Sequence, residues 1–440
     1  MKKFKKKKRL IFLTLDPLNP LNIKLTKRLE EDFSIVIVTN FKLPSSYPFK
    51  NIKFDYQHNF LESFFLFFYK HIESKSEKEF IKRNVYRKYR SLINIMFRIK
   101  KLLPLPSYSS ICFFLYKNKQ VENGIIKPDD ICITDATLRH TLSLNPLIVR
   151  ASIITKKLVA NVTSWDNPQY STINTFAQKY LVWNKTNRDE LTNFHKIKKN
   201  NIAIVGSIFH DYLINNYKLN AKNYRKTSNN EIVVLYAAIF PGSDEVMAAD
   251  EVKFILFIGN ELKKRYSNLR LIFRTYPSSE NSFLYNSLRE IEWIDVYEHS
   301  NYIKIPRLGN ESEVISFNKE DEKIKQFHDV DVLLSAGSTF TIEFAFSNKP
   351  IIHINATVFS RNFKNSKFLE RLDIYGHLKH LSPDGFDINV VGKTDDLLNN
   401  IGKLKELKSS GYNEYLKSFA KPYSKSLSRN LISHSLKNFF

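Results

Sequence analysis

The sequence predicts an α/β protein made of two doubly wound halves, each a parallel sheet covered by helices on both faces. Three observations predict it. Short runs of uninterrupted apolar residues recur along the chain, amphipathic stretches separate them, and the pattern begins again after a polar stretch at 215–230. Strands buried on both faces read as continuous apolar runs, because neither face of such a sheet meets water. The chain of 440 residues is long enough for two domains of ~200 residues each.

The apolar runs give the order of the expected strands. In the first half, strands are expected at 10–15, 34–40, 130–135, 157–165, 179–184 and 201–207. In the second half they are expected at 231–239, 268–277, 329–338 and 349–355, with a helix near 244–265. We therefore expect an N-terminal domain over 1–212, a second domain over 225–405 and a C-terminal helical segment over 406–440. Doubly wound sheets bind ligands beyond the carboxyl ends of their strands, so a cleft between the two halves is the expected ligand site.

Charge and cysteine content narrow the class of protein. The net charge is +24, which favours an anionic partner, although abundant Lys, Asn and Ile also indicate a general compositional bias. The two cysteines, Cys112 and Cys132, lie in apolar runs and are too few for a disulfide framework or a zinc site, so no metal site is expected. A basic start leads into an apolar run, Leu10–Leu15, that is too short for a signal peptide or a membrane span. The sequence predicts a cytoplasmic protein, with peripheral attachment to the inner face of the membrane as an option.

Residues 60–105 interrupt the strand pattern. Between 70 and 101 there are eleven Lys or Arg and three Glu, interleaved with Phe, Tyr, Ile and Leu. A helix of this composition suits a surface of anionic lipid. The alternative is a solvated face over an ordinary core helix. No nucleic-acid motif accompanies the segment, so no nucleic-acid partner is expected.

The stretch "SAGSTFTIE" at 335–343 predicts a nucleotide site. Gly337 permits a tight turn after a strand, and Ser338 and Thr339 stand at a helix start, where backbone amides and the helix dipole favour phosphate. Glu343 follows Thr339 by four residues, which is not capping-box spacing. It would lie one turn into the helix, where a carboxylate could accept hydrogen bonds from the vicinal hydroxyls of a ribose. The alternative is an ordinary capped helix whose Glu343 faces solvent.

A second candidate group follows the strand at 268–277. The strand ends at Arg274, and Tyr276 precedes a proline that turns the chain at the same sheet edge. A fixed cation there would neutralise a diphosphate leaving group. Arg274 as a simple surface charge is the alternative.

The third candidate group, Trp165, Asp166 and Asn167, follows a strand of the first half in "VTSWDNP". Its polar groups are expected to line the cleft from the acceptor side. Asp166 could act as general base on an acceptor hydroxyl, or it could bond to backbone as an ordinary turn residue.

These motifs, together with "YLVWNKTNRDEL" and "IVGS..HD", resemble bacterial GT-B glycosyltransferases of surface-polysaccharide assembly. The resemblance extends to CDP-glycerol glycerophosphotransferases and nucleotide-sugar 2-epimerases, and covers 125–211 and 231–355. It implies two Rossmann-like domains facing across a cleft, with the donor phosphate at the Ser/Thr turn and the ribose at the Glu. One departure concerns Tyr276, because related sequences often have His there. Tyrosine donates one hydrogen bond but cannot be a cation, so a role carried over for that histidine is in doubt.

The sequence therefore predicts a metal-independent glycosyltransferase that uses a nucleotide-sugar donor and a lipid-linked or oligosaccharide acceptor, with no further cofactor. Two alternatives stay open. One is a transferase of polyol phosphate from a CDP-linked donor on the same architecture. The other is a non-catalytic scaffold or RNA-binding protein that keeps the fold.

Overall fold

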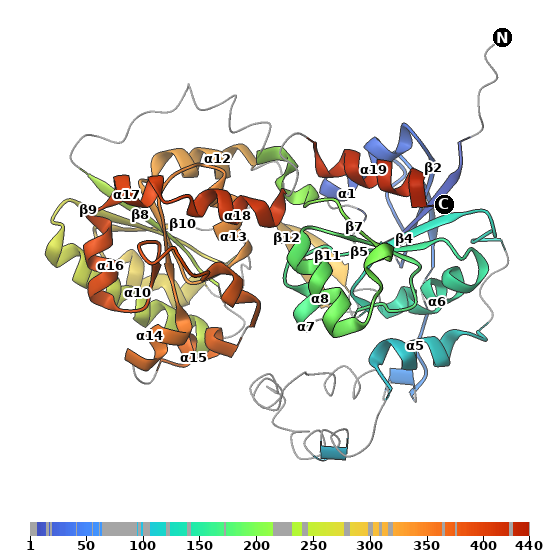
Figure 1. Cartoon of the computed structure of the whole chain (residues 1–440), viewed down its shortest axis with the longest axis horizontal. Helices are drawn as coiled ribbons and strands as arrows, with labels where there is room; N and C mark the ends of the chain where they lie inside the picture. Colours follow the sequence, from blue (N-terminus) through green and yellow to red (C-terminus); the bar gives the residue numbers. More distant parts are fainter. Residues whose placement is uncertain are drawn as a thin grey trace, which may run out of the picture. The chain divides into compact units, whose positions relative to one another are not determined.

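The structure, a computed structural model of the whole chain, contains two compact units, each built around its own parallel sheet (Figure 1). Unit 1 comprises residues 1–209, 306–310 and 421–440, and unit 2 comprises 210–305 and 311–420. The residues that the structure describes are 7–14, 17, 20–40, 42–54, 56–60, 62–63, 95, 98–99, 106–119, 124–138, 142–170, 173–213, 231–239, 245–276, 282–297, 302–307, 310–315, 320–362, 366–374, 376–421 and 426–439.

The sheet of unit 1 has seven strands in the order β3-β2-β1-β4-β5-β6-β7, and every neighbouring pair is parallel. The strands are β1 Arg9–Leu13, β2 Ser34–Thr39, β3 Lys50–Lys53, β4 Ile131–Asp135, β5 Leu158–Asn161, β6 Lys179–Val182 and β7 Ile202–Ile204. The strand order reverses between β1 and β4, which confirms the doubly wound arrangement predicted for the first half.

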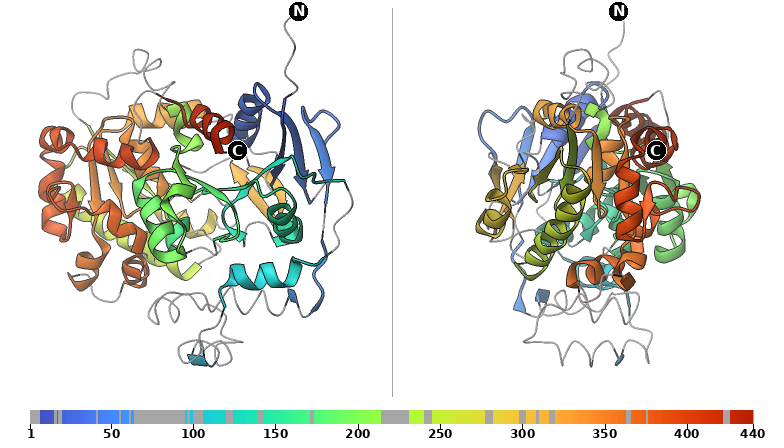
Figure 2. Two further views of the ribbon diagram at one scale, coloured as in Figure 1. Left: turned by 45° about the vertical axis from the view of Figure 1, so that its right-hand side comes forward. Right: turned by 90° about the vertical axis from the view of Figure 1, so that its left-hand side faces the viewer.

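Among the described residues, the α-helices of unit 1 include α1 Pro20–Glu30, α5 Tyr108–Tyr116, α6 Asn145–Ile154, α7 Asn167–Tyr170, α8 Lys185–His195 and α19 Ser428–Phe439. Helix α6 is buried along most of its length and packs against β5 and α5. The C-terminal helix α19, dark red in the figures, lies beside the blue helix α1 (Figures 1 and 2). Of the segment predicted at 406–440, residues from Lys421 onward thus belong with the N-terminal half, and those up to Ala420 belong to unit 2.

Asp32, just after α1, fastens α19 to unit 1. Its carboxylate accepts hydrogen bonds from Arg28 Nη1 at 3.0 Å and from Ser433 Oγ at 2.5 Å, and Lys437 Nζ lies 2.6 Å from Oδ1. Burial alone would raise the pKa of Asp32, but hydrogen bonds from Lys437, Ser433 and Arg28 outweigh it and lower the pKa to about 2. A carboxyl group with a lowered pKa in the folded state stabilises the fold only while it is ionised.

Asp32→Asn is therefore expected to cost about 1 kcal/mol of unfolding free energy at pH 7, the size of a partly exposed ion pair. The loss should be fully present above about pH 4 and should vanish as the pH falls toward 2, because the folded-state pKa of Asp32 is about 2. Urea unfolding of both proteins across this pH range measures it. Glu31→Gln is the control, since Glu31 also pairs with Arg28, at 2.9 Å, but its side chain is 66% exposed. A pH-independent difference for Asp32→Asn, or an equal loss for Glu31→Gln, would contradict the assignment.

The sheet of unit 2 has six parallel strands in the order β10-β9-β8-β13-β14-β15. They are β8 Ile232–Ala237, β9 Leu269–Arg274, β10 Ile294–Tyr297, β13 Val332–Ser335, β14 Ile351–Ile354 and β15 Val390–Val391. The strand order reverses between β8 and β13, so this half is doubly wound as well, as predicted. A separate two-stranded sheet pairs β11 Tyr302–Arg307 with β12 Asn310–Ile315.

The helices of unit 2 are α10 Glu245–Arg265, α11 Asn286–Arg289, α12 Glu320–Asp329, α13 Thr339–Ala345, α14 Ala356–Asn362, α15 Lys367–Ile374, α16 Thr394–Ile401, α17 Leu404–Ser409 and α18 Tyr412–Ala420. Helix α10, expected near 244–265, packs against β9, α15 and α16. Helix α13 packs against β13 and α18. The α/β class predicted from the sequence is confirmed in both units.

Two other expectations concern membranes. Among the described residues, no helix is both long enough and apolar enough to cross a membrane. The basic and aromatic segment predicted to contact anionic lipid, residues 60–105, falls almost entirely outside the described residues. Its lipid contact stays a prediction.

Candidate functional site

The turn between β13 and α13 lies where the strand order of unit 2 reverses. Strand β13 ends at Ser335, its neighbour β8 belongs to the other half of the sheet, and α13 begins at Thr339. In open parallel sheets this reversal leaves a crevice at the carboxyl ends of the strands, where ligands bind. The sequence-predicted residues Gly337, Ser338 and Thr339 all stand in this turn.

Side chains on both sides of the turn hold its shape. Gly337 has a φ of +108°, a conformation that favours glycine, and its amide donates to Ser335 Oγ at 3.1 Å. Ser335 Oγ in turn shares a hydrogen bond with Thr341 Oγ1, which accepts a weak bond from the Ser338 amide at 3.4 Å. The Ser338 amide, which the sequence predicts to be open to phosphate, is thus partly engaged by Thr341. Ser338 and Thr339 are half-buried.

Glu343 forms an ion pair with Lys323 of α12, in which Lys323 Nζ lies 2.8 Å from Oε2. Only 13% of the Glu343 side chain and 20% of the Lys323 side chain are exposed. Burial alone would raise the pKa of Glu343, but the nearby positive charge of Lys323 outweighs it and the net pKa is lowered. Glu343 is therefore ionised at neutral pH and is held by a partner that the sequence did not reveal. Its role at a ribose stays a prediction.

Arg274 is a buried cation at the same end of the sheet. Its side chain lies between the rings of Tyr297 and Phe340, with ring centroids 5.1 and 5.2 Å from the guanidinium carbon, and Nη1 donates to Gln326 Oε1 at 2.5 Å. The residue is only 6% exposed, which excludes the surface-charge interpretation. Because Phe340 is the second residue of α13, this packing brings Arg274 to the start of that helix. Tyr276 follows two residues later and is half-buried.

His210 is a further titratable group beside α13, and the sequence motif "HD" did not assign it a role. Its ring stacks on Phe346, with centroids 6.0 Å apart, and the residue is fully buried. Burial lowers the pKa of His210 to about 4, so the ring is neutral at pH 7. The negative charge of Glu343 opposes this lowering of the His210 pKa.

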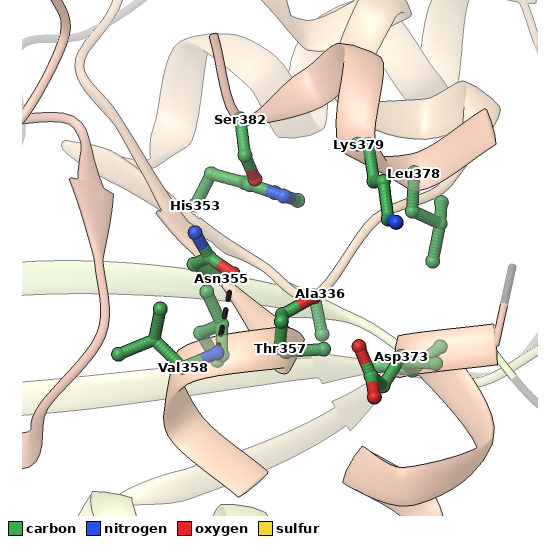
Figure 3. Close-up of a pocket in the computed structure, with 12 residues that line it drawn as sticks. Ala336, His353, Asn355, Thr357, Val358, Asp373, Leu378, Lys379 and Ser382 are labelled. Atoms are coloured by element: carbon green, nitrogen blue, oxygen red, sulfur yellow. Dashed lines mark hydrogen bonds between the residues drawn. The ribbon is translucent and has the colours of Figure 1, made fainter. Parts of the chain in front are cut away.

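A pocket of about 260 Å³ opens beside the turn at the carboxyl ends of β13 and β14 (Figure 3). Its apolar walls are Ala336, Ile354, Ala356, Val358, Leu372 and Leu378. Its polar residues are His353, Asn355, Thr357, Asp373, Lys379 and Ser382. A Cβ placed on Gly337 would lie 2.8 Å from Leu378 Cδ2 and 3.4 Å from His353 Cε1, so the turn and the pocket adjoin. None of the polar lining residues was predicted from the sequence.

In unit 1, the predicted residues Trp165, Asp166 and Asn167 form one compact turn after β5. Ser164 Oγ donates a short hydrogen bond to Asp166 Oδ1, the Gln169 amide donates to the Asp166 carbonyl at 3.1 Å, and Asn167 Nδ2 donates to Thr163 Oγ1 at 3.3 Å. Trp165 is 3% exposed, and Asp166 is half-buried. These hydrogen bonds support the interpretation of Asp166 as a turn residue. A catalytic role for Asp166 stays a prediction.

Helix α8 holds this turn in place. Asn187 Nδ2 donates to the Trp165 carbonyl at 2.6 Å, and Gln169 Nε2 donates to Glu190 Oε1 at 2.7 Å. His195 Nε2 lies 2.7 Å from the Pro168 carbonyl oxygen. The motifs "SWDNP" and "YLVWNKTNRDEL" are therefore two parts of one structure.

Asp135 is the acidic residue at the point where the strand order of unit 1 reverses. It ends β4, and its carboxylate accepts from the Thr137 amide at 2.7 Å and from Thr163 Oγ1 at 3.0 Å. The second bond joins Asp135 to the segment that carries Asp166. Its sequence signal was the polar residue that closes the apolar run "ICITD".

No family model matches the sequence, and no curated protein matches it. Solved structures with a similar chain path include HepE of Anabaena in complex with UDP and glucose (10% identity, 98% of this chain and 100% of that chain, TM-score 0.47). Another is the UDP-GlcNAc 2-epimerase of Methanocaldococcus jannaschii (14% identity, 98% of this chain and 99% of that chain, TM-score 0.46). A third is the wall teichoic acid polymerase TagF (10% identity, 98% of this chain and 89% of that chain, TM-score 0.44). They are the kinds of protein that the sequence motifs resemble. At such low identities, a function for this chain has to be argued from its own residues.

Proposed function

We propose that this chain is a glycosyltransferase that holds a nucleotide-sugar donor in unit 2 and transfers the sugar to a lipid-linked or oligosaccharide acceptor. The observation that carries the proposal is the β13–α13 turn. It stands at the strand reversal of a doubly wound sheet, with a shaped glycine turn, two hydroxyl residues, a buried arginine and an ionised glutamate around one helix start.

Each group has a proposed task. The hydroxyls of Ser338 and Thr339 and the amides of the helix start would bind the donor phosphates, and Glu343 would accept from the ribose hydroxyls. Arg274 would offset the charge that develops on the departing nucleotide, acting from a site in which a buried cation is weakly screened. With these groups supplying the positive charge, we propose that no metal is needed. A first-half carboxylate, Asp166 by preference, would take the proton of the acceptor hydroxyl.

The attachment of a lipid-linked acceptor would bring the enzyme to a membrane. We propose that the basic and aromatic segment 60–105 makes that contact, on the strength of its composition. Sedimentation of the full chain with phosphatidylglycerol vesicles, compared with neutral phosphatidylcholine vesicles, tests this. Equal binding to both would count against it.

A thermal-shift panel on the full chain tests the nucleotide assignment. Saturable stabilisation by UDP, GDP or CMP is expected, because a ligand that binds only the folded state raises the melting temperature with concentration. Stabilisation by CDP and CDP-glycerol alone would favour polyol-phosphate transfer. Salt-dependent RNA affinity without any nucleotide response would favour a scaffold.

Asp166→Asn is expected to lower turnover by ~10²–10⁴-fold, the usual contribution of a general base, while donor affinity changes less than about twofold. Release of nucleotide from the donor that the panel identifies, in the presence of acceptor lipid extract, measures it. Ser164→Ala is the control, since it removes the hydrogen bond to Asp166 and leaves the carboxylate. If both variants lose similar stability and keep their turnover, Asp166 is a turn residue only.

A further inference from the structure

His353 is a buried polar side chain with an unsatisfied ring nitrogen. It lies on β14 and is 2% exposed, yet its Nδ1 has no hydrogen-bond partner among the described residues. A buried ring nitrogen without a partner costs free energy, since it has given up its bond to water. Such a group in a native protein calls for an explanation, and a ligand is one.

The same ring lines the 260 Å³ pocket beside the β13–α13 turn. Figure 3 shows the imidazole of His353, the carboxylate of Asp373 and the ammonium group of Lys379 directed into one space. Asn355, which also lines the pocket, accepts from the Val358 amide at 3.3 Å through its Oδ1, as a cap of α14. The His353 ring thus borders a cavity, while most of its surface is buried.

We infer that this pocket binds a neutral, hydroxyl-bearing group of monosaccharide or short-polyol size, and that His353 is the residue that recognises one of its hydroxyls.

Three properties of the pocket select this class of ligand. The unpartnered Nδ1 of a neutral imidazole either donates or accepts, depending on the tautomer, and a hydroxyl group can supply the complementary partner in both cases. Burial lowers the pKa of His353 to about 3, so the ring carries no charge that would attract an anion. The volume of 260 Å³ holds about nine non-hydrogen atoms, if each takes roughly the space of one water (~30 Å³).

The walls suit the same ligand. A sugar or polyol presents C–H groups as well as hydroxyls, and the pocket pairs apolar side chains such as Leu372 and Leu378 with the hydroxyls of Thr357 and Ser382. A charged ligand would find Asp373 and Lys379 together, so neither sign of charge is favoured by these two.

The position of the pocket connects this inference to the proposed function. Ala336 belongs to both the turn and the pocket, and Leu378 and His353 lie in contact range of Gly337. A group linked to a phosphate at Ser338 would therefore lie near the pocket. The inference deepens the proposed function and rests on it only where the hydroxylated group is part of a nucleotide-linked donor. The same chemistry could also come from a free sugar or polyol.

Histidine NMR on the full chain tests the inference and separates these sources. The chain has 11 histidines, so 13Cε1-histidine labelling gives few signals, and the signal lost in His353→Gln is that of His353. Glucose, glycerol, UDP and UDP-glucose are titrated separately at pH 7. We expect the His353 signal to shift saturably with glucose or glycerol and with UDP-glucose, and not with UDP alone. A silent His353 in all four titrations, or an equal shift with UDP alone, would overturn the inference.

Affinity measurements on variants give the second readout. His353→Phe keeps an aromatic ring but removes the hydrogen bond, and it should lower the affinity gain of UDP-glucose over UDP by about tenfold, the size of one good hydrogen bond. His353→Gln should restore part of the gain. If His353→Phe keeps the whole gain, the imidazole does not recognise the group. If no nucleotide binds but glucose or glycerol still shifts His353, the pocket stands and the nucleotide proposal fails.

Discussion

Replacing Gly337 with Ala is expected to destabilise unit 2 by about 3 kcal/mol and to abolish nucleotide binding. The φ of +108° strains any residue with a Cβ, at a cost of about 1–2 kcal/mol. The new Cβ would also stand 2.8 Å from Leu378 Cδ2, and overpacking of this kind typically costs ~1–3 kcal/mol. Relief of either cost moves the turn that we propose to bind phosphate. Urea unfolding and the nucleotide thermal-shift panel measure the two effects.

Gly385 offers a matched control. Its φ is +86°, so Ala is strained there too, but a Cβ would meet nothing within 4 Å. Gly385→Ala should therefore lose only the backbone part and should keep nucleotide binding. The double variant Gly337→Ala with Leu378→Ala should recover part of the binding, because it removes the close contact. Equal behaviour of the two single variants would show that the β13–α13 turn has no special role.

Glu343→Gln is expected to weaken nucleotide affinity by ~10–100-fold. It replaces a charged acceptor with a neutral one of the same shape, and hydrogen bonds to charged groups contribute about 1.5–3 kcal/mol. Alanine is a poorer choice, because Glu343 forms a largely buried pair with Lys323 at 2.8 Å, and deleting one partner of such a pair destabilises the fold itself. Calorimetric titration with the nucleotide that stabilises the chain most measures the loss.

Lys323→Met separates the two roles of Glu343. It removes the ion pair but leaves the carboxylate, so affinity should fall by less than about fivefold even though unfolding free energy drops. In the double variant, the loss of affinity should follow that of Glu343→Gln. If the two single variants lose affinity equally and in proportion to their lost stability, Glu343 serves only the fold.

The strands that the sequence predicted are the nine central ones and one edge strand, β7. All ten expected positions contain a strand. The central parallel strands are buried on both faces and therefore leave an apolar run such as "IVVLYA". The strands that were not predicted are β3, β10 and β15, which stand at sheet edges, and β11 and β12, which form a separate two-stranded sheet. Strand β3 reads "KNIK" with exposed residues, and β15 has only two residues. Edge strands need no apolar run, so composition cannot reveal them.

The site was predictable only as far as local sequence decides it. The glycine turn and helix start of α13 follow from neighbouring residues, and both are present. The partners that hold the site come from distant parts of the chain, such as Lys323 for Glu343 and Tyr297 for Arg274. No spacing rule connects them. His353 did leave a signal, a single histidine inside the apolar run "PIIHI", but a buried core histidine has the same pattern.

The C-terminal helix shows the same limit. The sequence predicted a helical segment over 406–440, and α19 is part of it. Its place beside α1 depends on the contacts of Asp32 with Ser433 and Lys437. Ser433 is 401 residues away from Asp32 in the sequence. Such pairing is a property of the folded chain.

A crystal structure of the full chain with the most stabilising nucleotide bound tests the central claim most directly. We expect the phosphates to bind at Ser338 and Thr339, in the turn that connects β13 to α13. We expect the ribose hydroxyls to lie within hydrogen-bond distance of Glu343. A nucleotide bound elsewhere, with the Glu343–Lys323 pair and the Gly337 turn untouched, would contradict the account.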